Sequence, residues 1–295
     1  MIILRLLRFS INDKGHIGLQ LENRIIDLTT AAEDFKVVFP DNIESIIGKE
    51  YLVDELLGKI KEKSINRYVV SKEELKYLPV SSSPEKIICV GVNYQEHADE
   101  SNLDVLEHPV LFNKFNNSLH AHNEPIVMPK DSLENDYEAE LAIMIGKEAQ
   151  NITREEALQY VFGYTIANDV SSRDWQMRTH QWMLGKSVDQ YCPIGPVLVT
   201  ADEIDDPQQL DIQLYLNGEI RQHSNTSKMI YDCISIISYL SSHMTLRPGD
   251  IILTGTPEGV ILGMDPSTRQ YLQHGDETII EIEGIGTLKN TFIRK

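Results

Sequence analysis

The stretch DYEAELAIMIGK, residues 136–147, decides how the middle of this chain folds. Apolar residues recur at every second position, the spacing of a β-strand with one face in a core: Leu141, Ile143 and Ile145. The opposite face begins with Glu138 and Glu140, whose Cα atoms would lie roughly 6.5 Å apart on a strand. On an exposed strand, water would screen the repulsion between the two carboxylates and the pair would have no function. If the pair lines a cleft, a hard divalent cation with oxygen ligands is its natural partner.

Length and charge limit the class of protein. The chain has 295 residues, enough for one large domain or for a core domain with a smaller partner. Hydrophobic residues make up 41% and charged residues 24%, which is typical of a soluble globular protein. The formal net charge of −18 argues against binding to nucleic acid or to an anionic membrane surface. An anionic substrate stays possible, because a bound metal and a few cationic side chains can invert the local sign of charge.

The cysteines and the N-terminal stretch indicate a cytoplasmic protein. Cys89, Cys192 and Cys233 are odd in number, far apart and flanked by apolar residues, which favours buried thiols over disulfides or a zinc site. Residues 1–10 are apolar but interrupted by two arginines, which predicts a strand and not a signal peptide. No run reaches the roughly 18 apolar residues that a membrane-spanning helix needs.

The order of predicted elements indicates an α+β protein rich in strands. Residues 41–63 have helix-like spacing, and the Ser/Pro-rich stretch VSSSPEK at 80–86 predicts a boundary after them. We therefore expect a small N-terminal α/β domain at 1–80 and a main domain at 81–295. The main domain alternates short strands with turns, including a hairpin signal at Asn217–Gly218. This texture predicts a mixed, largely antiparallel β architecture with few helices.

A third carboxylate follows another predicted strand. Asp169 ends the strand at 162–169, where side chains often project into a site. Beside Glu138 and Glu140 it would complete a set of three oxygen ligands that suits Mg²⁺ or Mn²⁺. Taken alone, Asn168–Asp169 is interpreted more simply as the cap of a helix over 171–178.

Three further features could carry chemistry. His97 and Glu100 lie three residues apart, so on a helix they share a face and could form a pair that activates water, although an isolated His is more often a solvated one. Lys186 follows a glycine and is either a surface lysine or a cation aimed at a carboxylate or enolate. The loop at 254–259 could hold an anion, but it lacks the Gly-Lys-Ser/Thr ending of a nucleotide-binding loop.

Together these features resemble one known family. The segments that carry the resemblance are KIICVGVNYQEHADE, PVLFNK, DYEAELAIMIGK, GYTIANDVSSRDWQ, GKSVDQYCPIGP, NGEIRQ, LRPGDIILTGTPEG and HGDETIIEIEGIGTLKN. In order, they resemble the fumarylacetoacetate hydrolase family over roughly residues 84–292. Residues 1–83 resemble the variable N-terminal region of the longer bacterial members. The resemblance implies a mixed β-sandwich roll, usually dimeric, and a fold that hosts several reactions.

The resemblance also implies roles for individual residues. The metal ligands of the family fall on Glu138, Glu140 and Asp169, with Mg²⁺ or Mn²⁺ as the cofactor. The water-activating dyad, carried on a lid, falls on His97 and Glu100. The residue that helps position the water falls on Gln176. The lysine that binds substrate and stabilises an enolate falls on Lys186. The two residues that contact the substrate's carboxylate fall on Thr256 and Lys114.

Two departures from the family pattern bear on substrate specificity. Some acylpyruvate-cleaving relatives have a basic residue where this chain has Val92, so one anchor for a carboxylate is missing or replaced. The glycine loop reads GVILG after Glu258 where relatives often have GVG, and the insertion MDPSTRQYLQ follows.

These residues lead us to expect a metal-dependent hydrolase that cleaves a C–C bond in an anionic 2-oxo acid of the acylpyruvate or fumarylpyruvate type. His97, oriented by Glu100, would take a proton from water, and Lys186 would stabilise the leaving enolate. The first alternative is oxaloacetate-type decarboxylation, which uses the same metal and lysine without an attacking water. The second is isomerisation of an unsaturated dioate in aromatic-acid breakdown, and a more distant one is a non-catalytic metal-binding scaffold.

Overall fold

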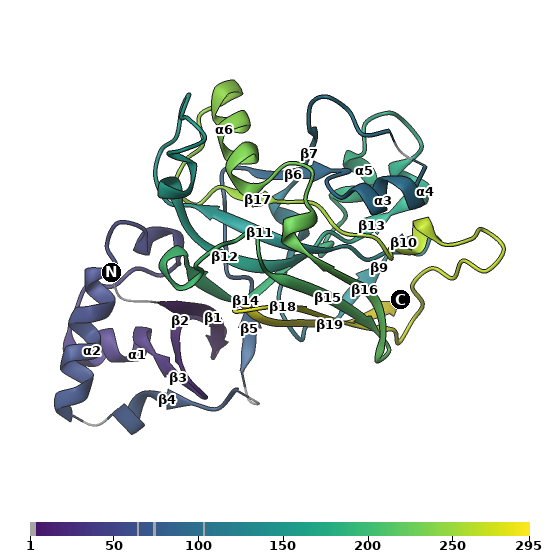
Figure 1. The fold of residues 1–295 in the computed structure, drawn as a ribbon. Helices are drawn as coiled ribbons and strands as arrows, with labels where there is room; N and C mark the ends of the chain where they lie inside the picture. The colour runs from purple at the N-terminus through teal and green to yellow at the C-terminus, as the bar shows by residue number, and fades with distance from the viewer. Residues whose placement is uncertain (1–3, 64, 73–74, 103) are drawn as a thin grey trace.

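The computed structural model describes residues 4–63, 65–72, 75–102 and 104–295 (Figure 1). Its centre is a large mixed sheet with the strand order β4-β3-β2-β1-β14-β12-β11-β17-β6-β7, in which β5 also pairs with β1 and β8 with β14. These strands are β1 Arg5–Ile11, β2 Lys14–Leu21, β3 Arg24–Asp27, β4 Val69–Val70, β5 Lys76–Leu78, β6 Ile87–Gly91, β7 Val110–Lys114, β8 Leu119–His120, β11 Ala139–Ile145, β12 Val161–Asn168, β14 Cys192–Thr200 and β17 Ile251–Leu253. Most neighbours are antiparallel and a few, such as β17 and β6, are parallel, which confirms the predicted mixed architecture.

Two smaller sheets pack beside the large one. The first has the order β16-β15-β18-β19-β9, and the second pairs β10 with β13. Their strands are β9 Ile126–Met128, β10 Asn135–Asp136, β13 Ser171–Ser172, β15 Asp211–Leu216, β16 Glu219–Asn225, β18 Glu277–Ile282 and β19 Gly286–Arg294. The hairpin between β15 and β16 turns at Asn217 and Gly218, which both have positive φ as the predicted two-residue turn requires.

Helices are few and mostly short. They are α1 Leu28–Phe35, α2 Tyr51–Lys63, α3 Gln95–Glu100, α4 Arg173–Gln176, α5 Met183–Lys186 and α6 Cys233–His243. Residues 41–63, predicted as helical, form one 3₁₀ turn at Glu44–Ile46 and then α2. None of the helices in the described part of the chain is long and apolar enough to cross a membrane.

Strand β11 is buried on both faces, whereas its sequence predicted one face in a core. Leu141 and Ile143 pack in one hydrophobic cluster, and Ala142 and Met144 pack in another. The first cluster contains residues of α6 and of the smaller sheet, and the second contains residues of the N-terminal region. The two glutamates therefore begin a strand face that leads into a core and not into solvent.

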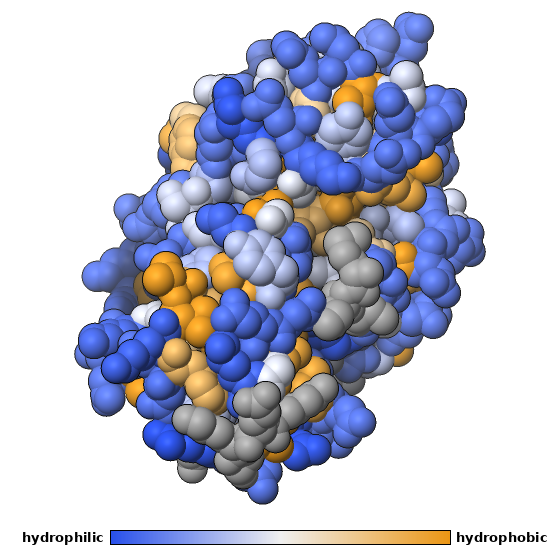
Figure 2. All heavy atoms as spheres, turned by 90° about the vertical axis from the view of Figure 1, so that its left-hand side faces the viewer, coloured by the Kyte–Doolittle hydropathy of each residue, from blue (hydrophilic) through white to orange (hydrophobic). Residues whose placement is uncertain are grey.

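The N-terminal region is continuous with the main sheet. Strand β1 pairs with β14 through Leu6 and Leu198, and Leu56 of α2 shares a hydrophobic cluster with Met144 of β11. The sheet and the core thus run across the predicted boundary near residue 80. Figure 2 shows the face of the molecule that carries this region, where most of the surface is hydrophilic and hydrophobic side chains form small separate groups. The three cysteines are free and buried, as expected.

Replacing Asp27 by alanine tests how helix α1 begins. The Asp27 carboxylate accepts hydrogen bonds from the Thr30 backbone N–H at 3.0 Å and from His16 Nδ1 at 3.0 Å. We expect Asp27→Ala to lower the free energy of unfolding by about 1–2 kcal/mol, because a helix cap and the partner of a buried imidazole are lost together. Asp27→Asn is the control, since its amide oxygen can still accept from Thr30. Equal urea midpoints for the alanine variant and the unsubstituted protein would contradict this prediction.

Candidate active site

Three carboxylates meet where strands β11 and β12 lie side by side. Ala139 is paired with Asn168, so Glu138 and Asp169 flank the same point of the ladder, and Asp169 N–H donates to Glu138 O at 2.9 Å. Glu140 lies one residue further along β11. One oxygen from each of Glu138, Glu140 and Asp169 lies within 4.8 Å of the others, and all three residues are buried. The structure therefore brings together the three predicted metal ligands, and it shows no helix cap at Asp169.

Cations surround two of the three carboxylates. Lys186 Nζ lies 2.7 Å from Glu138 and 2.9 Å from Asp169, and Arg173 lies 2.7 Å from Glu138. Burial alone would raise the pKa of Glu138, but Lys186 and Arg173 outweigh burial and lower this pKa to about 2. Lys114 Nζ lies 2.5 Å from Asp169.

Glu140 differs from its two neighbours. Within the described residues it has no cationic partner, and its carboxylate accepts one hydrogen bond, from Gly255 N–H at 2.7 Å. Burial and the adjacent charges of Asp169 and Glu138 raise the pKa of Glu140 well above its ordinary value. A third buried carboxylate with only a backbone donor is what a divalent cation would neutralise. Three carboxylates also form the oxygen-rich donor set that Mg²⁺ and Mn²⁺ prefer, so these residues fit such an ion.

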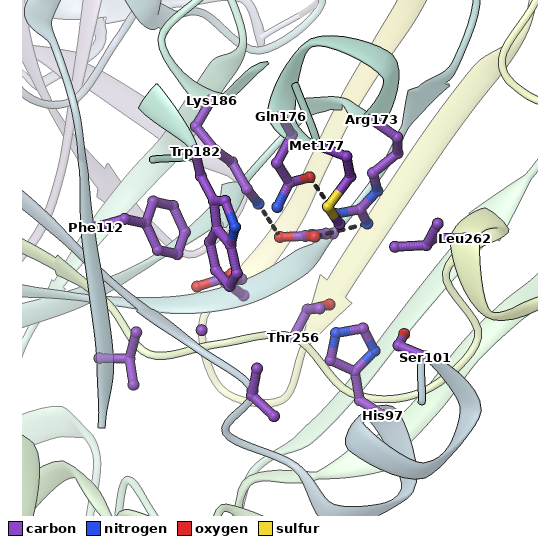
Figure 3. Close-up of a pocket in the computed structure, with 15 residues that line it drawn as sticks. His97, Ser101, Phe112, Arg173, Gln176, Met177, Trp182, Lys186, Thr256 and Leu262 are labelled. Carbon is purple, nitrogen blue, oxygen red and sulfur yellow. Dashed lines mark hydrogen bonds and ion pairs between the residues drawn. The ribbon is translucent and has the colours of Figure 1, made fainter. Parts of the chain in front are cut away.

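His97 and Glu100 lie on helix α3, and His97 lies across the cavity from Lys186 and Arg173 (Figure 3). His97 Nδ1 is 3.0 Å from Glu100 Oε1. A carboxylate can only accept, so Nδ1 carries the proton in this contact and Nε2 of a neutral imidazole keeps its lone pair. The second oxygen of Glu100 accepts from Gly259 N–H at 2.9 Å. The pair therefore has the geometry of an oriented general base.

The cavity between these groups has a mixed lining. Its charged and polar residues include Glu138, Glu140, Arg173, Gln176 and Lys186, and its apolar residues include Val92, Phe112, Met177, Trp182 and Leu262. Figure 3 shows Met177 beside Gln176 and Arg173, and Trp182 beside Lys186. The volume of the cavity is ≈ 30 Å³.

Val92 has an unusual backbone conformation within this lining. Its φ is +56°, a left-handed value that is rare and costly for a β-branched residue. The preceding Gly91 has no room for a side chain, because a Cβ there would lie 2.8 Å from the Trp182 ring. A residue held in such a conformation beside a cavity is typical of a functional site.

The other predicted site residues take different places. Gln176 lines the cavity and accepts from Arg173 at 3.0 Å, and Thr256 lines it while its hydroxyl accepts from the buried Gln222 at 2.8 Å. Lys114 is not among the residues that line the cavity: its ammonium is fully buried, lies 2.5 Å from Asp169 and also donates to Val170 O at 3.1 Å. In this position Lys114 holds a carboxylate of the protein.

Two residues that the sequence analysis did not single out connect the site. Arg173 bridges Glu138 and Asp136, and the fully buried Asp136 lies 2.9 Å from it. The signal was available in the segment VSSRDWQ, which puts Arg173 only four residues beyond Asp169. No periodicity in the sequence indicated that Asp136 would face this arginine.

The sequence of this chain is similar to those of known proteins. Residues 86–293 match the family described as fumarylacetoacetate (FAA) hydrolase, C-terminal. The chain is 44% identical over 230 residues to oxaloacetate tautomerase fahd2, mitochondrial, from Xenopus laevis, covering 77% of this chain and 72% of that protein. It is 37% identical over 286 residues to oxaloacetate tautomerase Fahd2a, mitochondrial, from Rattus norvegicus, covering 95% and 88%.

Solved structures agree with these matches. A fumarylacetoacetate hydrolase from Exiguobacterium antarcticum is 34% identical with a TM-score of 0.83, covering 99% of this chain and 100% of that one. Maleylpyruvate hydrolase from Sphingobium sp. SYK-6, in complex with manganese(II) ion and pyruvate, is 31% identical with a TM-score of 0.77, covering 98% and 99%. The predicted strand-rich α+β fold is confirmed by these neighbours.

Proposed function

The chain belongs to the fumarylacetoacetate hydrolase family of enzymes, and from this premise we propose that it is a divalent-metal-dependent enzyme that moves a proton in an anionic 2-oxo acid, as a keto–enol tautomerase of oxaloacetate-type substrates. The observation that supports this proposal most is a cluster of three buried carboxylates, two of which, Glu138 and Glu140, line the same cavity as His97, whose imidazole is paired with Glu100. The names of the relatives from Xenopus laevis and Rattus norvegicus favour tautomerisation among the reactions of the family.

Mg²⁺ or Mn²⁺ would be held by Glu138, Glu140 and Asp169, and it would supply Lewis-acid polarisation of the 2-oxo group. His97 Nε2 takes a proton from the carbon next to the 2-oxo group, while Glu100 holds Nδ1–H and stabilises the resulting imidazolium. The C–H electron pair becomes the C=C bond and the carbonyl electron pair moves to oxygen. This oxygen then takes the proton from the His97 imidazolium to give the enol, which returns His97 to its neutral form. The ammonium of Lys186, which lies beside Glu138 and Asp169, stabilises the developing negative charge.

Substrate binding uses the remaining residues of the cavity. Gln176 orients a polar group of the substrate or a water, and Thr256 contacts the carboxylate. Lys114 acts indirectly, by holding Asp169 in place through their 2.5 Å ion pair. We also propose that the chain forms a homodimer and that it is cytoplasmic. Both relatives named above are called mitochondrial.

Hydrolysis of an acylpyruvate is the second candidate. It is favoured by the dyad geometry, which suits activation of water, and by the maleylpyruvate hydrolase among the structural neighbours. Both reactions share the enolate and the metal, so they differ in whether His97 takes its proton from carbon or from water.

Turnover of two substrates tests the proposal. The purified protein is given oxaloacetate and, separately, an acylpyruvate, each with Mn²⁺ and again with EDTA. We expect Mn²⁺ to accelerate keto–enol exchange of oxaloacetate well above the rate with free metal, and EDTA to abolish the acceleration. Rapid cleavage of the acylpyruvate without tautomerisation would replace the proposed reaction by hydrolysis. Loss of CO₂ from oxaloacetate, without faster keto–enol exchange, would replace it by decarboxylation.

A further inference from the structure

Residues 259–263, which we call the landing segment, lie between the lid helix α3 and the strands that carry the carboxylates. We propose that Gly263 of this segment is a positioning residue: its missing side chain leaves the space that the Glu100 carboxyl group needs in order to orient His97. The proposal rests on the proposed function, in which His97 is the base and Glu100 its partner. It goes further because it assigns a role to a residue of the segment in which this chain departs from its family pattern.

One side of the landing segment is fixed to strand β10 and the residue after it. Asp136 accepts hydrogen bonds from the backbone N–H groups of Ile261 and Leu262, each at 2.9 Å. The Tyr137 hydroxyl donates to Gly259 O at 3.0 Å. Asp136 and Tyr137 are fully buried, so these three bonds are shielded from water. The position of the landing segment is therefore set by residues that directly precede Glu138.

The other side of the landing segment contacts Glu100 of helix α3. Glu100 Oε2 accepts from Gly259 N–H at 2.9 Å, and Glu100 Oε1 contacts His97 Nδ1 at 3.0 Å. The two oxygens of one carboxylate thus join the landing segment to the imidazole. A change in where this carboxylate sits must change either the bond to Gly259 or the bond to His97.

Gly263 fits against this same carboxylate. A Cβ at Gly263 would lie 2.4 Å from Glu100 Cδ and 2.7 Å from Glu100 Cγ. Gly263 does not have the left-handed φ that requires glycine, unlike Gly259 at +100°. Backbone conformation therefore gives no reason for a glycine at position 263, and contact with Glu100 does.

The three atoms nearest to an added methyl group at position 263 all belong to the Glu100 side chain. Carbon atoms make favourable contact at about 3.5–4.0 Å, so the Glu100 carboxyl carbon must retreat by about 1 Å. This carboxyl group is the end of a flexible side chain, so it can move without unfolding the protein. A hydrogen bond of 3.0 Å that lengthens by about 1 Å is no longer a hydrogen bond. His97 would then lose the partner that fixes its tautomer and orientation.

A double-mutant cycle tests the inference. Gly263→Ala, Glu100→Ala and the double variant are compared with the unsubstituted protein in kcat and KM with Mn²⁺. We expect Gly263→Ala to lower kcat by about 10–100-fold, as a misplacement of about 1 Å can, with KM and Mn²⁺ affinity little changed. Where Glu100 is already alanine, Gly263→Ala should have no further effect, because the group it displaces is gone. An equal fractional loss in both backgrounds, or no loss in either, would overturn the inference.

Hydrogen exchange of residues 95–101 gives a readout that does not depend on turnover. We expect faster exchange in Gly263→Ala than in the unsubstituted protein, and no difference between Glu100→Ala and the double variant. Gly58→Ala is the matched control, since Gly58 is exposed in α2 and its added Cβ would meet nothing within 4 Å. If no 2-oxo acid is turned over, the proposed function fails while this comparison still decides whether Gly263 positions the lid through Glu100.

A second variant tests the same inference if the Gly263→Ala protein does not fold. Tyr137→Phe keeps the buried ring but removes the hydroxyl that holds Gly259 O. It should loosen the landing segment, with a smaller fall in kcat and faster exchange of residues 95–101. Unchanged exchange and unchanged kcat in this variant would count against the landing segment as the support of the lid.

Discussion

Glu140→Gln is expected to abolish metal-dependent turnover and, at the same time, to make the metal-free protein more stable. The amide removes one of the three negative oxygens that would hold the cation. Mn²⁺ affinity should therefore fall by more than the roughly 10–100-fold that follows from losing a residue that only hydrogen-bonds to a metal ligand. The stability gain has a separate origin. Glu140 is buried beside Asp169 and Glu138 without a cation of its own, and the raised pKa of Glu140 reflects that cost.

The pH dependence gives the sign of this effect. A carboxyl group whose pKa is raised on folding binds its proton more tightly in the folded state, so the metal-free protein loses stability as pH rises above the ordinary value of 4.5. Glu140→Gln should lack that loss. Urea unfolding in EDTA across pH 4.5–7.5 measures it, and parallel profiles for the two proteins would contradict the prediction.

Glu138→Gln is the matched control for this experiment. The pKa of Glu138 is lowered to about 2, because Lys186 and Arg173 outweigh its burial. Removing this charge leaves two buried cations with one partner fewer, so the metal-free Glu138→Gln protein should be less stable than the unsubstituted one. Both variants should lose Mn²⁺ affinity, but their stabilities in EDTA should change in opposite directions. A shift in the same direction would show that the two carboxylates do not differ as described.

Part of the carboxylate cluster could be predicted from a local pattern. The i, i+2 spacing of Glu138 and Glu140 fixes their common face. Asp169, which directly follows the neighbouring antiparallel strand, was assigned to the cluster by the family resemblance, since its own sequence context favoured a helix cap. The burial of both faces of β11 could not be predicted in the same way. Residues such as Leu56 share a hydrophobic cluster with Ala142 and Met144, and they come from a region of the sequence that carried no usable motif.

The direction of individual side chains was the second feature that could not be predicted from the sequence. The resemblance to the family implies that Lys114 contacts the substrate's carboxylate, but the direction of its side chain depends on how β7 packs. In the structure its ammonium contacts Asp169 and Val170 O. Asp136 was missed for a related reason. Besides the neighbouring Tyr137 N–H, its donors are Arg173 and the backbone of residues 261–262, which are distant in sequence, and no short spacing encodes such a meeting.

His97→Asn is expected to lower kcat for 2-oxo acids by about 10²–10⁴-fold, the usual contribution of a general base. Asparagine removes the imidazole Nε2 but keeps an N–H that can donate to Glu100, so α3 should stay in place. KM and Mn²⁺ affinity should change little, since His97 is not among the three carboxylates that would hold the ion. Steady-state kinetics and Mn²⁺ titration measure these quantities. A kcat within threefold of the unsubstituted protein would remove His97 from the chemistry.

The same variant separates the two candidate reactions. If His97 takes its proton from carbon, His97→Asn should suppress keto–enol exchange and slow the exchange of substrate C–H with deuterium from the solvent by a similar factor. If His97 instead activates water, acylpyruvate cleavage should fall while C–H exchange continues, because an enolate stabilised by Lys186 can still form and be reprotonated by solvent. Measuring both rates in one protein therefore assigns the atom that gives its proton to His97, and with it the reaction.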